Sequence, residues 1–172
     1  LTVVTTCDPK LQQAARKALE RGLRQLDQRQ RVMRFRRSLR GRALKRTLKE
    51  LRRKQPARPV PGRIYRAVVT KLNDRSGLAT VTLGRATGEI DLRHEPRYNP
   101  KRKAPSKVLR RSTVVYVRPL ASPGKKGQPV PLRLAQGPEG AVVILDVKTR
   151  EVRAMVGGYG QRVGDFNRAL SA

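Results

Sequence analysis

The densest group of chemically active side chains is a run of basic residues between positions 31 and 55. It holds twelve lysines and arginines against one acid, Glu50. Guanidinium and ammonium groups bind phosphate and carboxylate, so the chemistry open to this run is contact with an anion. The candidate anion contacts are Arg34, Arg37, Arg40, Arg42, Lys45, Arg46, Lys49, Arg52 and Arg53.

The element that would position these cations is a basic amphipathic helix. Apolar residues recur within the run at spacings of three to four, which predicts one helix over 31–55 or two helices divided near Gly41. Two interpretations stay open. The thin apolar stripe docks on the body while the arginine face is solvated, or that face contacts an anionic surface.

No catalytic, cofactor-binding or metal-ligating residues are predicted. His94 is the one histidine and has no plausible serine partner, so no nucleophile and base can be paired. Cys7 is the one cysteine, which excludes an internal disulfide and, with a single histidine, a Cys/His zinc cluster. Both side chains are expected to be isolated and buried or half-buried.

The composition predicts a small apolar core and a large positive charge that an anionic partner would balance. The chain has 172 residues, a formal net charge of +29, 37% hydrophobic residues and 3% aromatic residues. The candidate partners for this charge are nucleic acid, anionic lipid headgroups and an anionic cell-wall polymer. Adaptation to arginine-rich codons would raise the charge without any binding purpose. No apolar run approaches the roughly 20 residues that cross a bilayer.

Periodicity predicts a helix, a barrel and a hairpin in that order. Residues 1–8 are rich in β-branched types and predict a strand, and Asp8-Pro9 predicts the start of a helix that continues to about Gln28. A proline-rich segment, 55–62, predicts an extended linker. Five strands then follow at 63–72, 78–83, 87–92, 112–118 and 130–135, and a hairpin at 141–146 and 151–156.

The predicted fold class is α+β: a small five-stranded OB-like β-barrel inserted in a subdomain of basic helices and a short sheet. The predicted domains are 1–59, with the first strand and the basic helices, 60–136, the barrel, and 137–172, the hairpin. We expect the strand over 1–8 to pair with the hairpin and so bring the two flanks together.

Two stretches resemble the class A penicillin-binding proteins. Thr5–Ala15 is similar to the strand-to-helix entry of that family. Gly140–Ala169 is similar to the hairpin that opens its transpeptidase domain, with Val152-Arg153-Ala154-Met155-Val156-Gly157-Gly158-Tyr159 followed by Phe166-Asn167-Arg168-Ala169. The barrel resembles, by position and strand pattern, the insertion domain of the 1A-type subgroup. The family usually has Thr-Gly at the hairpin turn where this sequence has Thr149-Arg150, which leaves the turn type open because arginine does not readily take a positive φ.

The resemblance implies the segment between two catalytic sites of a bifunctional peptidoglycan synthase. In that family the nucleophile lies in a Ser-x-x-Lys motif after the Phe166–Ala169 cluster, and no such motif follows the cluster here. The segment is therefore expected to be non-catalytic and to space a glycosyltransferase from a D,D-transpeptidase. The implied location is the periplasmic face of the bacterial inner membrane, with the anchor in a segment outside this sequence. The implied partners are peptidoglycan, an anionic lipid surface or a regulatory protein, and no cofactor is implied.

Two alternatives remain at this point. An S1-like barrel that binds single-stranded RNA would use Tyr65, Tyr98 and Tyr116 as stacking platforms, but so few aromatic residues make nucleic acid an unlikely partner. The other alternative is a structural spacer without any ligand.

Overall fold

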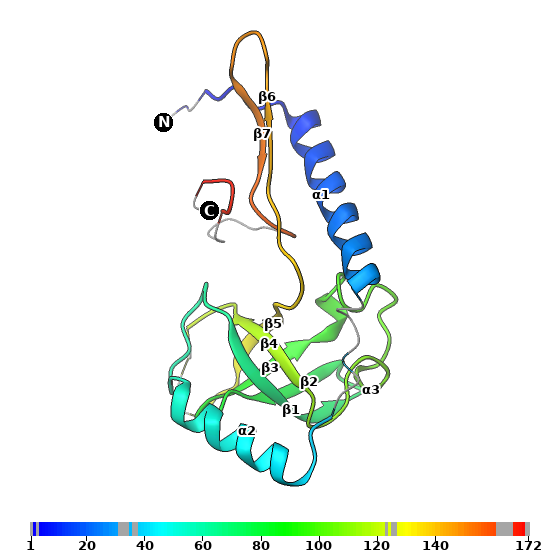
Figure 1. The fold of residues 1–172 in the computed structure, drawn as a ribbon, viewed down its shortest axis with the longest axis vertical. Coiled ribbons are helices and arrows are strands. Elements are labelled where there is room, and N and C mark those ends of the chain that lie inside the picture. Colours follow the sequence, from blue (N-terminus) through cyan, green and yellow to red (C-terminus); the bar gives the residue numbers. More distant parts are fainter. Residues whose placement is uncertain are drawn as a thin grey trace. The chain divides into compact units, whose positions relative to one another are not determined.

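The structure is a computed structural model that describes residues 2, 4–30, 35, 38–122, 124, 127–160 and 167–170. The chain forms two compact units, of which one is Val32–Gln136 and the other combines Leu1–Arg31 with Gly137–Ala172. The first unit carries a closed barrel and the second carries one long helix with a two-stranded sheet (Figure 1).

The barrel is built from five short strands. They are β1 (Tyr65–Asn73), β2 (Leu78–Thr82), β3 (Thr87–Asp91), β4 (Val114–Pro119) and β5 (Val130–Leu134). Their order around the barrel is β1-β2-β3-β5-β4, with β4 returning to pair with β1. Every pair is antiparallel except β3 with β5. This arrangement is an OB-type barrel.

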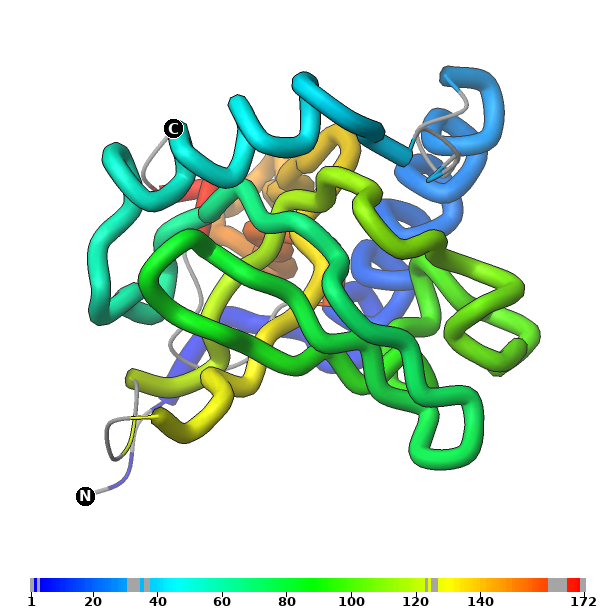
Figure 2. Tube along the Cα trace, turned by 90° about the horizontal axis from the view of Figure 1, so that it is seen from below, coloured from blue at the N-terminus to red at the C-terminus, as the bar shows by residue number. Residues whose placement is uncertain are grey.

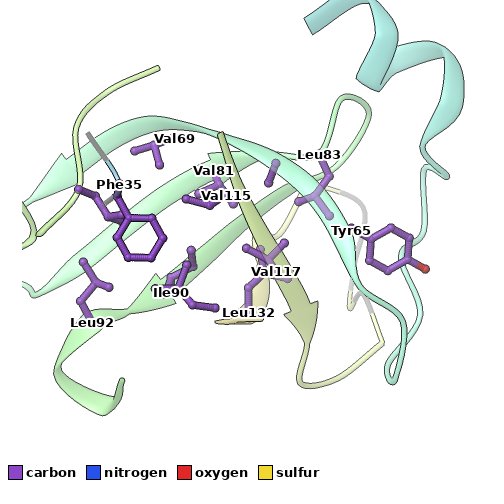
Figure 3. Close-up of a cluster of buried hydrophobic side chains, with 14 of the residues drawn as sticks. Phe35, Tyr65, Val69, Val81, Leu83, Ile90, Leu92, Val115, Val117 and Leu132 are labelled. Carbon is purple, nitrogen blue, oxygen red and sulfur yellow. The ribbon is translucent and has the colours of Figure 1, made fainter. Parts of the chain in front are cut away.

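Alternation along the strands produces the barrel core. On β2 and β4 alternate residues point inward, so that Ala79, Val81, Val115 and Val117 are fully buried. Figure 3 shows these strands' apolar side chains meeting in one cluster with Leu132 of β5. At β3, glycine at position 88 leaves room for the Leu132 side chain against the parallel partner strand.

One end of the barrel is closed by the segment between β3 and β4. It contains the 3₁₀ helix η1 (Leu92–His94) and the short α3 (Pro105–Val108). The carboxylate of Glu95, which is buried, accepts a hydrogen bond from the backbone N–H of Leu134 at 3.1 Å. The Tyr98 hydroxyl donates to the carbonyl of Gln136 at 2.6 Å and accepts from its N–H at 2.8 Å. These bonds tie the segment to the end of β5.

A helix lies along the outside of the barrel. It is α2 (Gly41–Lys54), drawn in cyan in Figures 1 and 2, and it packs against β1. Just before it, Ser38 forms an isolated bridge with Thr113, and the N–H of Leu39 donates to the carbonyl of Ser112 at 2.9 Å. Phe35 is buried in the barrel core.

The second unit packs α1 (Pro9–Gln30) against a hairpin of β6 (Val142–Leu145) and β7 (Val152–Val156). Ala15 of α1 and Ala154 and Val156 of β7 form its small core, with Leu19 and Ile144 packed against them. The other face of β6 leaves Val143 and Leu145 exposed. None of the helices that the structure describes has the length and hydropathy that crossing a membrane requires.

The fold class predicted from the sequence is confirmed, and the strands lie within two residues of their predicted bounds. The strand predicted over 1–8 is wrong for the residues described there. Val4 is 91% exposed. Among the described residues of 1–8, the backbone hydrogen bond to the hairpin is the one from the N–H of Asp8 to the carbonyl of Arg153, at 2.8 Å. The domain boundaries at 59/60 and 136/137 remain predictions. Contacts group residues 32–59 with the barrel, because α2 packs on it.

Candidate functional site

The outward face of α2 carries most of the predicted anion contacts. Arg42, Arg46, Lys49 and Arg53 are spaced by four, three and four residues, which places them on one helical face, and all four are exposed. We call these four residues the outer stripe. Lys45 and Arg52 are exposed beside it, and Arg40 is the residue that precedes the helix. Arg34 and Arg37 lie outside the described residues.

The opposite face of α2 fixes its orientation. Thr47 and Leu51 are buried, and the helix backbone lies directly on Gly84, which follows β2. A Cβ at Gly84 would stand 2.5 Å from the carbonyl carbon of Leu51 and 2.6 Å from the backbone nitrogen of Arg52. This backbone contact fixes how the helix lies on the barrel, and the outer stripe faces solvent.

The single acid of the helix is held on the barrel side. The Glu50 carboxylate pairs with Lys54 at 2.9 Å and with Arg66 of β1 at 3.5 Å. The Lys54 hydrogen bond and charge, and then the charge of Arg66, lower the pKa of Glu50 below its ordinary value. The amide of Gln55 also donates to the carbonyl of Arg66 at 3.2 Å. Glu50 thus neutralises Lys54 and Arg66 where α2 lies beside β1.

A second polar cluster sits where β3 runs into η1. Asp91 accepts two hydrogen bonds from the Arg93 guanidinium, at 2.9 and 2.8 Å, and lies 3.0 Å from His94 Nδ1. The Arg93 hydrogen bonds hold the pKa of Asp91 well below its ordinary value. The side chain of His94 is 79% exposed, which corrects the expected burial. No serine stands in this cluster, and it organises the turn at Arg93, whose N–H also bonds Asp91.

Cys7 and a Ser-x-x-Lys spacing are the other sequence features that could carry chemistry. Cys7 is exposed, which corrects its expected burial, and its sulfur lies 4.0 Å from the Gln12 amide oxygen. Among the residues that the structure covers, no group of His, Cys, Asp and Glu could hold a metal ion. The spacing Ser-x-x-Lys occurs once, at Ser122–Lys125, in the loop between β4 and β5, where Pro123 and Lys125 are outside the described residues.

The three tyrosines expected to stack on bases differ in their exposure. Tyr65 and Tyr98 are 8% and 7% exposed, so their faces are packed in the core, whereas Tyr116 is 46% exposed. Binding of single strands relies on several aromatic faces that track successive bases. Two of the three tyrosines expected to stack are therefore committed to the core.

In the second unit, the two stretches that carry the resemblance meet in one structure. The side-chain amide of Gln12 imitates a strand: its Nε2 donates to the Met155 carbonyl at 2.8 Å, and its Oε1 accepts from the Met155 N–H at 2.9 Å. Asp8 caps α1 by accepting from the N–H groups of Lys10 and Leu11. Sequence reasoning found the Asp8 cap but missed Gln12, because a helical glutamine carries no signal for a distant strand.

The curated proteins that are similar to this chain include penicillin-binding proteins 1A. No family model matches the chain. Two curated relatives, penicillin-binding protein 1A of Rickettsia felis and that of Rickettsia bellii, are 29% and 28% identical over 174 residues, which is all of this chain and 20% of each relative. The chain thus spans about a fifth of the length of these relatives. These matches support a class A penicillin-binding protein segment.

A solved structure, penicillin-binding protein 1A from Haemophilus influenzae, is 20% identical with a TM-score of 0.35 and covers 96% of this chain and 23% of its own. Of the Phe166–Ala169 cluster, residues 167–169 are described. Arg168 pairs with Glu139 at 3.6 Å, and its N–H donates to the carbonyl of Gly157 at 3.2 Å. The cluster is thereby attached to the end of β7.

Proposed function

We propose that this segment is the non-catalytic linker and barrel of a bifunctional peptidoglycan synthase, and that α2 holds the barrel against an anionic surface of the cell envelope. The parent protein would polymerise glycan strands and cross-link their peptides at the periplasmic face of the inner membrane. The matches of the whole of this chain to a fifth of penicillin-binding protein 1A support this parent.

The observation that carries the surface role is the way α2 is docked. Contact between its backbone and Gly84 settles which face is outward, and Glu50 is engaged with Lys54 and Arg66 on the barrel side. The outer stripe is left as a row of cations that a flat anionic surface can meet together. Lipid phosphates attract such residues by up to about 1 kcal/mol each. A solvated face without a partner is the alternative that the experiment must separate.

The test is sedimentation of the 172-residue chain with vesicles of phosphatidylcholine, alone or mixed with phosphatidylglycerol. We expect binding only to the mixed vesicles. The triple variant Arg42→Gln, Arg46→Gln and Arg53→Gln should weaken it on the order of 100-fold, since three charges near the surface are lost.

The matched control removes three exposed arginines from α1: Arg21→Gln, Arg24→Gln and Arg29→Gln. It changes the net charge by the same amount on the other basic helix. Equal weakening by both triple variants would mean that only total charge matters. Indifference of the unmodified chain to phosphatidylglycerol would leave the spacer role alone.

A further inference from the structure

A cavity of about 610 Å³ lies at the closed end of the barrel. Its apolar lining includes Pro100, which is exposed, and Val108, which is half-buried, together with the buried Phe35, Tyr98 and Leu109. The rings of Phe35 and Tyr98 are tilted at 60° with their centroids 6.1 Å apart. A cavity of this size matches the volume that encloses small ligands. The helix α2 contributes no residue to it, so this site is separate from the outer stripe.

Four cations surround this apolar lining. Lys101, Lys103, Lys107 and Arg110 all line the cavity and are exposed. The carboxylate of Asp74 reaches this lining and is bound by the N–H and hydroxyl of Ser106 at 2.9 and 2.6 Å. Those Ser106 hydrogen bonds, and to a lesser degree the charge of Lys107, lower the pKa of Asp74 below its ordinary value. Asp74 therefore shapes the rim, and the four cations retain a net positive field.

The backbone that carries these cations is held by a buried asparagine. Asn99 accepts a hydrogen bond from the Lys103 N–H at 2.8 Å and donates to the Lys103 carbonyl at 2.8 Å and to the Leu92 carbonyl at 3.1 Å. Its own N–H donates to the carbonyl of Glu95 at 2.7 Å. The N–H of Leu109 donates to the carbonyl of Pro105 at 2.8 Å and closes the turn of α3. The loop is thus preorganised, which lowers the entropic cost of gathering its cations on a ligand.

We propose that this cavity binds a small phosphorylated molecule, with the phosphate among the lysines and an apolar group against Pro100 and Val108. Several cations around one concavity favour a multiply charged group over a single carboxylate, and lysine acts as a point charge toward phosphate. The accessible apolar side chains of Pro100 and Val108 favour a ligand with an apolar part over a bare ion. This inference does not depend on the role proposed for α2.

The test is a titration of the ¹⁵N-labelled 172-residue chain, followed by amide chemical shifts at constant ionic strength. The probes are inorganic pyrophosphate, glucose 1-phosphate, monomeric dihexanoyl phosphatidic acid and, as the uncharged match, methyl glucoside. We expect saturable shifts confined to the amides of residues 98–110 with at least one of the two phosphorylated organic probes. The tighter of these two shows whether the phosphate comes from a soluble sugar or from a lipid. Methyl glucoside should give none, and pyrophosphate should bind more weakly.

The variants separate the cavity from general charge. Lys101→Gln with Lys103→Gln and Lys107→Gln should weaken the affinity about tenfold or more, since charged hydrogen bonds are lost. The matched control, Lys10→Gln with Lys17→Gln and Lys148→Gln, removes three exposed lysines from the other unit and should stay within about twofold of the unmodified chain. Replacing the three cavity lysines by arginine should retain binding and shows that the loop still folds. Shifts that spread over all basic surfaces, or equal weakening in both glutamine variants, would overturn the proposal.

Discussion

Arg150 has a backbone conformation that glycine adopts most readily. It ends the turn between β6 and β7 with φ +61°, in the left-handed region. Its N–H donates to the carbonyl of Asp146 at 2.8 Å, and the side chain of Asp146 accepts from the N–H groups of Lys148 and Thr149. The turn therefore places position 150 in a conformation that favours glycine, and the arginine bears a strain of about 1–2 kcal/mol.

The first prediction follows from that strain. Arg150→Gly should raise the free energy of unfolding of the hairpin unit by roughly 0.5 kcal/mol, because relief of the strain exceeds the extra freedom that glycine gives the unfolded chain. Hydrogen exchange of the β6 and β7 amides measures this change. Lys148→Gly, in the same turn but not at positive φ, is the control and should lower stability. A loss of protection in Arg150→Gly would contradict the strain argument.

At the scale of elements, the packing of α2 depends on one glycine. Gly84 has φ +101°, and any Cβ would collide with the backbone of Leu51 and Arg52, which cannot move without moving the helix. The N–H of Gly84 also bonds the hydroxyl of Thr82 at 3.1 Å, which sets the turn after β2. A close backbone approach between helix and barrel thus accompanies the packing of the buried Thr47 and Leu51 side chains.

The second prediction concerns this contact. Gly84→Ala should lower the free energy of unfolding of the barrel unit by about 2 kcal/mol or more and should remove exchange protection from α2, because clash and backbone strain act together. Gly62→Ala separates the two effects. Gly62 has φ +81° with no atom within 4 Å of its Cβ position, so it should cost about 1 kcal/mol and leave α2 protected. Equal loss of α2 protection in both variants would refute the docking contact.

How far the sequence predicted these elements depends on whether each signal was local. The barrel strands were predictable because inward and outward residues alternate, as on β2 and β4. The strand over 1–8 failed because β-branched residues such as Val4 form a strand only where a partner edge is present. Of the basic helix predicted over 31–55, in one piece or divided near Gly41, the structure has α2, which begins at Gly41. Before it, Ser38 bridges to Thr113, and 31–34, 36 and 37 lie outside the described residues.

The same difference between local and distant signals applies to the two candidate sites. The outer stripe was predictable because its spacing is helical and lies within one element. The cavity was not, because it joins Phe35 to Tyr98 and Leu109, which are distant in sequence and come together only when the barrel closes. The clamp formed by Asn99 also leaves no mark in the sequence, since asparagine in a basic loop ordinarily indicates a turn. Neither the cavity nor the Asn99 hydrogen bonds could therefore be predicted from a local sequence pattern.

At the scale of the whole molecule, the described residues form two apolar cores that share no residue. One lies inside the barrel, with Val81 fully buried, and the other joins α1 to the hairpin, with Val156 at 2% exposure. The barrel unit is one continuous stretch, Val32–Gln136, whereas the other unit is assembled from both ends of the chain. Cooperativity in folding comes from a shared core, so two separate cores predict two cooperative units.

The third prediction tests this division with one substitution in each core. Val81→Ala should lower the exchange protection of the β1–β5 amides by about 2 kcal/mol and leave that of α1, β6 and β7 nearly unchanged, because the cavity it creates is confined to the barrel. Val156→Ala should do the converse. Native-state hydrogen exchange of the whole chain measures both sets of amides in one sample. If either variant lowered both sets equally, the two cores would unfold as one unit, and the barrel could not be an independently stable insertion between its flanks.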